Sequence, residues 1–142
     1  MFSAILAGCG GPYTKHDFVA SANAICAAAV RDSRQLVPPT SGQLSALAPY
    51  LAKVVPIVQS EDRQMRALQH PTGSRSDSAT LAKYLAALKQ SVADFQALEA
   101  AAKAGNRSGV ASAEAALRVT PVTSLAASYG LRSCAAAGAT VA

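Results

Sequence analysis

Apolar residues recur three and four positions apart along most of the chain, which is the period of a helix with one buried face. The pattern predicts four helices, over residues 14–36, 41–70, 78–104 and 106–130. The positions expected to face the core are Phe18, Ala22, Ile25, Cys26, Ala29, Val30, Leu44, Leu47, Leu51, Val54, Val55, Val58, Met65, Leu68, Leu81, Leu85, Leu88, Val92, Phe95, Leu98, Ala102, Val110, Ala113, Leu117, Val122, Leu125 and Tyr129.

The residues around these segments carry start and stop signals for helices. Thr14 is followed three positions later by Asp17, which resembles a capping box, and Pro38 ends the first segment because the residue before a proline avoids helical geometry. Ser78 is the predicted cap of the third helix, after a polar, exposed loop over 71–78. Gly105 and Gly130 stand where the third and fourth helices are expected to end, and Ser108 or Asn106 is expected to begin the fourth.

Three prolines lie inside the predicted helices. Pro49 and Pro56 are expected to kink the second helix, or to move its start to near Pro49. Pro121 either kinks the fourth helix or restarts it as a new first turn.

Composition supports a single helical domain. The chain has 142 residues, and its hydrophobic content is largely alanine, with no tryptophan, which suits closely packed helices better than sheets. The formal net charge is +5, but lysine and arginine are scattered rather than gathered in a stripe, so the sequence does not predict nucleic-acid binding.

The first of the three cysteines stands in a short motif at the N-terminus. The segment Leu6-Ala7-Gly8-Cys9 looks like a bacterial lipobox, which predicts a lipid-modified Cys9 as the first residue of the mature chain. Residues 1–8 would then be the remnant of a signal peptide, and residues 9–13 a flexible tether to a membrane. The alternative is a partly buried free thiol on a frayed segment.

A signal peptide begins with a basic region that this sequence lacks. Only seven residues precede Gly8, and none of them is lysine or arginine. We therefore expect the natural chain to begin upstream of Met1.

The two other cysteines, Cys26 and Cys134, lie near opposite ends of the helical region. In an oxidising compartment they would close a disulfide loop worth about 4–5 kcal/mol in the loop-entropy picture, whereas in the cytosol they would remain reduced thiols. The helix pattern predicts an all-α, up-down-up-down four-helix bundle over 14–134 that is kinked at prolines. If the two cysteines are oxidised, one disulfide closes this bundle. A flexible tail is expected over 135–142.

Residues that could support catalysis do not gather in the sequence. His16 and His70 lack neighbours at metal-ligand spacing and are expected at the surface. Glu61 and Asp62 precede Arg63 and Arg66 at helical spacing, which predicts solvated salt bridges. The sequence thus predicts neither an enzyme nor a cofactor or metal site.

Three segments together resemble a family of small exported or lipid-anchored helical proteins from actinobacteria whose function is uncharacterised. They are residues 17–26, ending in Ala22-Asn23-Ala24-Ile25-Cys26; residues 50–57; and Tyr129-Gly130-Leu131-Arg132-Ser133-Cys134. The resemblance implies that Cys26 and Cys134 pair and that Pro56 is a regular kink, whereas Pro121 departs from the family pattern.

These observations predict a compartment rather than a reaction. We expect a non-catalytic cell-envelope lipoprotein outside the cytoplasm, anchored to the membrane through Cys9 or else secreted, acting through contacts with an envelope protein or as a surface structural component. The alternatives are a carrier for a small apolar or amphipathic ligand between the helices, and a cytosolic interaction module with reduced thiols.

Overall fold

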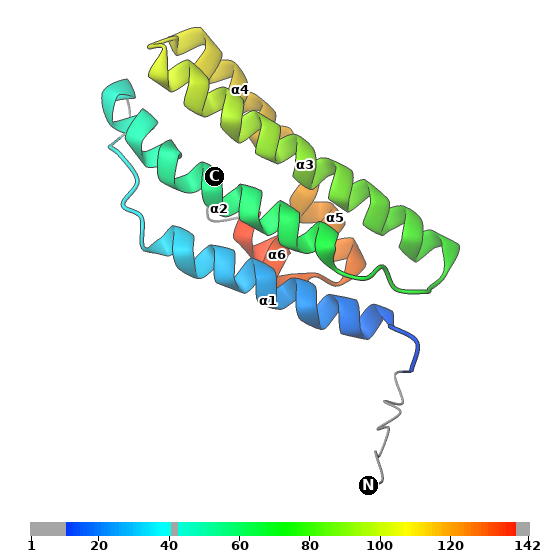
Figure 1. Cartoon of the computed structure of the whole chain (residues 1–142). Coiled ribbons are helices and arrows are strands. Elements are labelled where there is room, and N and C mark those ends of the chain that lie inside the picture. Colours follow the sequence, from blue (N-terminus) through cyan, green and yellow to red (C-terminus); the bar gives the residue numbers. More distant parts are fainter. Residues whose placement is uncertain (1–10, 41–42, 139–142) are drawn as a thin grey trace, which may run out of the picture.

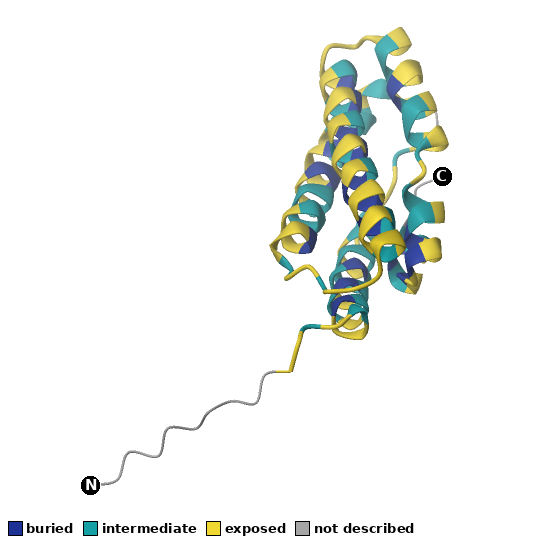
Figure 2. Cartoon of the chain, turned by 90° about the vertical axis from the view of Figure 1, so that its right-hand side faces the viewer, coloured by how far each residue is buried: buried dark blue, intermediate teal, exposed yellow. Residues whose placement is uncertain are grey.

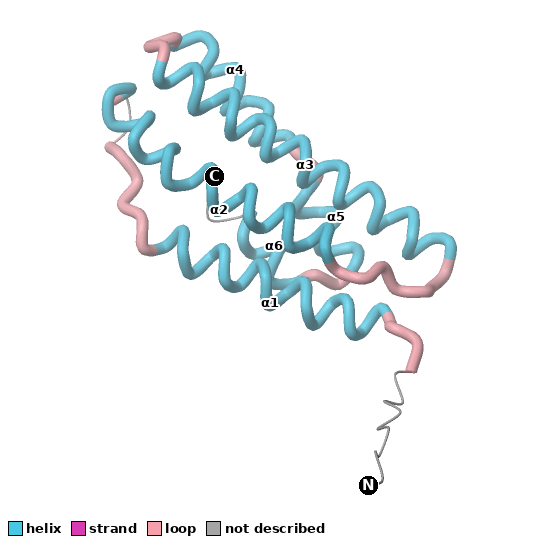
Figure 3. Tube along the Cα trace, in the orientation of Figure 1, coloured by secondary structure: helices cyan, strands magenta, loops and turns pink. Residues whose placement is uncertain are grey.

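The computed structural model describes residues 11–40 and 43–138, and within these ranges it consists of helices and loops without a strand (Figures 1 and 3). The helices are α1 (Lys15–Arg34), α2 (Leu44–Ala67), α3 (Arg75–Lys103), α4 (Arg107–Val119), α5 (Val122–Tyr129) and α6 (Arg132–Gly138). The all-α prediction is confirmed. The predicted signal-peptide remnant and Cys9 lie outside the described residues.

The caps of α1 and α4 lie where the sequence predicts them. The Thr14 hydroxyl accepts the Asp17 N–H, and the Asp17 carboxylate accepts the Thr14 N–H at 2.9 Å, which completes the capping box. Asn106 caps α4 by accepting the Gly109 N–H at 3.0 Å. Local side-chain chemistry alone decides these two helix starts.

The start of α3 differs from the prediction. Ser74, not Ser78, is the cap, because its hydroxyl accepts the Asp77 N–H at 3.1 Å. Residues 75–78 of the predicted loop are therefore the first turn of a helix. Because this turn carries no apolar residue, the hydrophobic period begins only at Leu81 and could not reveal it.

Two glycines end helices in the left-handed conformation that side chains avoid. Gly105 has φ +66° and Gly130 has φ +98°. After α5, the Leu131 N–H donates to the Ala126 carbonyl at 2.8 Å and the Gly130 N–H to the Ala127 carbonyl at 3.1 Å, which is a Schellman motif. Leu131 is completely buried, so this motif turns the chain back into the core.

Helix α2 runs through both of its prolines, and begins at Leu44 rather than near Pro49. The prolines remove the N–H groups that would bond the carbonyls of Ser45 and Ala52. Both prolines and both of these carbonyl-bearing residues are exposed, so water can replace the missing bonds.

The predicted fourth helix is two helices. Thr120 is extended (φ −62°, ψ 135°), and Pro121 begins α5 as its cap, so the chain restarts at Pro121. A further helix, α6, then follows. The structure therefore does not confirm an up-down arrangement of four helices.

The buried side chains form two clusters along the α2–α3 pair. Figure 2 marks the buried positions of the helices in dark blue. The disulfide cluster consists of Phe18, Ala22, Cys26, Met65, Leu81, Tyr84, Leu85, Leu88, Ala126, Tyr129, Leu131 and Cys134. The distal cluster consists of Leu51, Val54, Val55, Phe95, Leu98, Ala102 and Ala113. Helices α1, α5 and α6 thus cover one half of the α2–α3 pair, and α4 covers the other (Figure 1).

Helix α6 shortens the predicted flexible tail. Residues 135–138, expected to be flexible, are helical, and Ala135 packs against the disulfide cluster. The Asn23 side chain of α1 also accepts the Ser133 N–H at 2.9 Å, which holds the start of α6. The composition of 135–138 gave no sign of these long-range contacts, and residues 139–142 lie outside the described part.

A pair of serine variants tests the start of α3. Ser74→Ala removes the cap and is expected to lower the free energy of unfolding by about 1 kcal/mol. Ser78→Ala removes only a bond to a backbone carbonyl and is expected to cost less. Urea unfolding of both variants measures the difference, and a larger loss in Ser78→Ala would contradict the assignment.

Candidate functional site: a carboxyl group beside the disulfide

Cys26 and Cys134 form a disulfide that joins α1 to α6. Their Cα atoms are 5.0 Å apart although the residues are separated by 108 positions in the sequence. Cys26 shares the buried face of α1 with Phe18 and Ala22, eight and four positions before it. The two cysteines are 0% and 2% exposed. The predicted pairing is confirmed.

A carboxyl group of α2 lies directly against this disulfide. The Oε1 atom of Glu61 is 3.2 Å from the Sγ atom of Cys26. Because a disulfide sulfur carries no hydrogen, this is a contact and not a hydrogen bond. Glu61 precedes the fully buried Met65 by four positions, so both side chains lie on the same face of α2.

The setting of Glu61 favours its neutral form. Burial and, as the smaller cause, the negative charge of the neighbouring Asp62 together raise the pKa of the Glu61 carboxyl to about 7. Within residues 11–40 and 43–138, no basic side chain forms an ion pair with Glu61. Glu61 therefore changes its charge near neutral pH.

Tyr84 of α3 adds a second buried polar group. Its side chain is 0% exposed, and its hydroxyl has no hydrogen-bond partner in the structure. Burial raises the pKa of Tyr84, and the charges of Glu61 and Asp62 add to this effect. A buried hydroxyl without a partner is costly, so Tyr84 is held there by packing.

The prediction for the acidic pair was half right. Asp62 pairs with Arg66 at 2.9 Å, as expected from their spacing, and Arg66 also donates to the Leu85 carbonyl of α3 at 2.6 Å. Glu61 was expected to form a solvated salt bridge, but among the described residues it forms no ion pair and lies half-buried against Cys26. The buried positions Val54, Val55 and Met65 already placed Glu61 on the inner face, but its charge was taken as the stronger signal.

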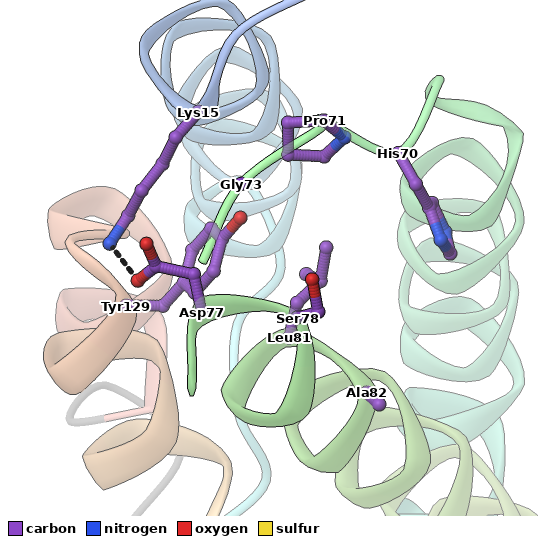
Figure 4. A pocket seen from close by; sticks show the side chains of 9 residues that line it. All are labelled: Lys15, His70, Pro71, Gly73, Asp77, Ser78, Leu81, Ala82 and Tyr129. Carbon is purple, nitrogen blue, oxygen red and sulfur yellow. Dashed lines mark hydrogen bonds and ion pairs between the residues drawn. The ribbon is translucent and has the colours of Figure 1, made fainter. Parts of the chain in front are cut away.

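A small cavity lies at the end of the molecule where α1 and α3 begin (Figure 4). Lys15 pairs with Asp77 at 2.6 Å and lies 4.6 Å from the centre of the Tyr129 ring. The hydrogen bond from Lys15, followed by that from Ser74, lowers the pKa of Asp77. The cavity measures about 70 Å³, which suits water rather than a substrate.

The two histidines are both exposed, as predicted. His70 lines this cavity on the side away from Lys15 (Figure 4), whereas His16 does not line it. Across the part of the chain that the structure describes, histidines, cysteines and carboxylates form no group that could hold a metal ion.

A larger, open groove of about 440 Å³ lies between the start of α2 and α4. Its walls combine the apolar side chains of Leu44, Leu47 and Val110 with the charged Arg107 and Glu114. No pattern in the sequence indicates this groove, because the groove forms between segments that are far apart in the chain.

No family model matches the chain, and no curated protein or solved structure is detectably similar to it. The resemblance to exported actinobacterial proteins therefore remains an expectation. Among the described helices, none combines the length and the hydropathy that crossing a membrane requires.

Replacing Glu61 by glutamine tests the site through pH. The folded pKa of Glu61, about 7, lies above its ordinary value of 4.5, so its stabilising contribution is complete below pH 4.5 and is lost as pH rises to 7. Glu61→Gln cannot ionise and is expected to be more stable than the wild type at pH 8, by at most about 3 kcal/mol, and equally stable near pH 4.

Urea unfolding at a series of pH values measures this difference. Glu114→Gln, which removes a carboxyl group from α4, controls for the change in net charge. A constant difference between Glu61→Gln and the wild type from pH 4 to pH 8 would contradict the buried carboxyl.

Proposed function

We propose that this protein is a non-catalytic lipoprotein of the cell envelope, anchored through Cys9 and acting through contacts with another envelope protein or as a surface structural component. The observation that carries the proposal is the buried Cys26–Cys134 disulfide. Cytosolic thiols are kept reduced, whereas disulfides persist in exported proteins. This argues against a cytosolic module with reduced thiols.

The disulfide suits a protein that must survive outside the cytoplasm. It joins the first helix to the last described one, so it restricts nearly the whole unfolded chain and contributes about 4–5 kcal/mol in the loop-entropy picture. A durable scaffold of this kind supports a structural or binding role.

The proposed anchor is consistent with the beginning of the described chain. Gly11 and Pro12 are exposed, and the first helix starts only at Lys15. A lipid on Cys9 would therefore be joined to the helices by a short tether, and the net charge of +5 would favour an anionic membrane surface. Secretion without an anchor is the alternative.

Mass spectrometry of the native protein tests the compartment and the anchor together. With a complete signal peptide supplied, the mature chain is expected to begin at Cys9 and to carry an acyl mass, and reduction should add two hydrogens. Cys9→Ser is expected to abolish the acyl mass and leave the disulfide intact. An unmodified Met1 with three free thiols would refute the proposal.

The open groove favours a second candidate function, binding of a small amphipathic ligand. Its volume of about 440 Å³ lies within the range of small-molecule sites. Leu47 and Val110 would contact the apolar part of the ligand, and Arg107 its acidic group.

A fluorescent fatty acid is a suitable probe of this second function. The wild type is expected to bind it, Arg107→Gln to bind it about tenfold more weakly, and the exposed Arg63→Gln of α2 to bind it as the wild type does. Equal binding by the wild type and Arg107→Gln would exclude the groove as the site.

A further inference from the structure

The two sulfur atoms of the disulfide have different surroundings. The Cys26 Sγ atom lies 3.2 Å from the Glu61 carboxyl, a group that can give and take a proton. The Cys134 Sγ atom lies 3.8 Å from the Ala22 carbonyl oxygen, which has no proton to give. A group that can donate and accept a proton therefore lies beside the Cys26 sulfur, and the carbonyl oxygen beside the Cys134 sulfur has no proton to give.

The two cysteines also differ in how firmly their helices are held. Cys26 lies in the middle of the 20-residue α1, whereas Cys134 lies in the 7-residue α6 after the left-handed turn at Gly130. A short helix with few contacts opens at a lower free energy than the whole domain. A reagent that reaches the buried pair when α6 moves therefore meets Cys134 first.

We propose that Cys26–Cys134 is an exchangeable disulfide and that Glu61 is its proton donor and acceptor. The reaction partner is a thiol, either a small molecule or a cysteine of a thiol–disulfide exchange protein. The proposal concerns the chemistry of the disulfide and does not depend on the lipid anchor at Cys9.

The opening step balances without a further reactant. The thiolate of the partner forms a bond to the Cys134 sulfur, the Cys26–Cys134 bond breaks, and Cys26 leaves with the electron pair. Glu61 then transfers its proton to the Cys26 thiolate. The products are a mixed disulfide at Cys134, a thiol at Cys26 and a carboxylate at Glu61.

Closure is the reverse reaction. The Glu61 carboxylate takes the proton from the Cys26 thiol, and the Cys26 thiolate attacks the Cys134 sulfur of the mixed disulfide. The bond to the partner breaks, and the partner leaves as a thiolate. The Cys26–Cys134 disulfide re-forms, and the mixed disulfide is reduced to the thiolate of the partner.

The groups that face Glu61 suit this role. Burial and the charge of Asp62 on the same helix together raise the pKa of Glu61 to about 7. This value is below the pKa of a thiol buried in apolar surroundings, so proton transfer from Glu61 to a Cys26 thiolate is favourable. From α3, the hydroxyl of Tyr84 has no hydrogen-bond partner. Arg66 is held by Asp62 and by the Leu85 carbonyl.

Reduction of the folded full-length chain by dithiothreitol tests the proposal. Rates measured from pH 5.5 to 8.5 are divided by the dithiothreitol thiolate concentration, so that the titration of the reagent is removed. The wild-type rate per thiolate is expected to rise by about tenfold or more as pH falls through 7, because Glu61 becomes protonated. Glu61→Gln should show no such rise.

Two further variants serve as controls. Glu61→Asp keeps a carboxyl group and is expected to restore part of the rise, and it tests the proposal should Glu61→Gln fold poorly. Asp32→Asn, at an exposed position of α1, is expected to behave as the wild type. The unfolding rate of each variant, measured in parallel, shows whether reduction requires global unfolding.

A purely structural role for Glu61 gives the opposite result. Protonation of Glu61 would then stabilise the packing around the disulfide and slow its opening, so the rate per thiolate would fall below pH 7. That outcome would overturn the proposal, as would equal rates in the wild type and Glu61→Gln or reduction limited by global unfolding. None of these results would change the mass expected for a lipidated Cys9.

Discussion

The bond between the first helix and the last described one is the constraint on which the arrangement depends. Helix α6 has only seven residues and would be marginal by itself. The Cys26–Cys134 bond and the buried Leu131 hold it against α1, and with it the end of α5. A covalent bond therefore joins α1 and α6, which are the first and the last helices that contribute to the disulfide cluster.

The same disulfide also forms part of the surroundings of Glu61. The α2 side chain that contacts this disulfide is Glu61, and it is partly buried there. A carboxyl group in such a place is destabilising when it is charged. Its position beside the Cys26 sulfur is the observation from which the proton transfer is proposed.

The division into two clusters follows from the break at Pro121. Extended Thr120 and the restart at Pro121 direct α4 to the distal cluster and α5 to the disulfide cluster. Where the clusters meet, the hydroxyl groups of Ser91 and Thr120 lie 3.1 Å apart and form a hydrogen bond. The buried Ser91 thus has a partner, and α3 remains continuous through both clusters.

The sequence by itself determined the helical class, the cap at Thr14 and the end of α5 at Gly130, and it limited the start of α4 to Asn106 or Ser108, because these signals depend on residues within one turn of each other. It also indicated the pairing of Cys26 with Cys134. The cap of α3 at Ser74 and the restart of the helix at Pro121 are also local features, although the hydrophobic period did not select them. Only the tertiary structure decided that α6 exists and that Glu61 is partly buried. These features depend on contacts between distant segments, which outweigh the polarity of a single residue.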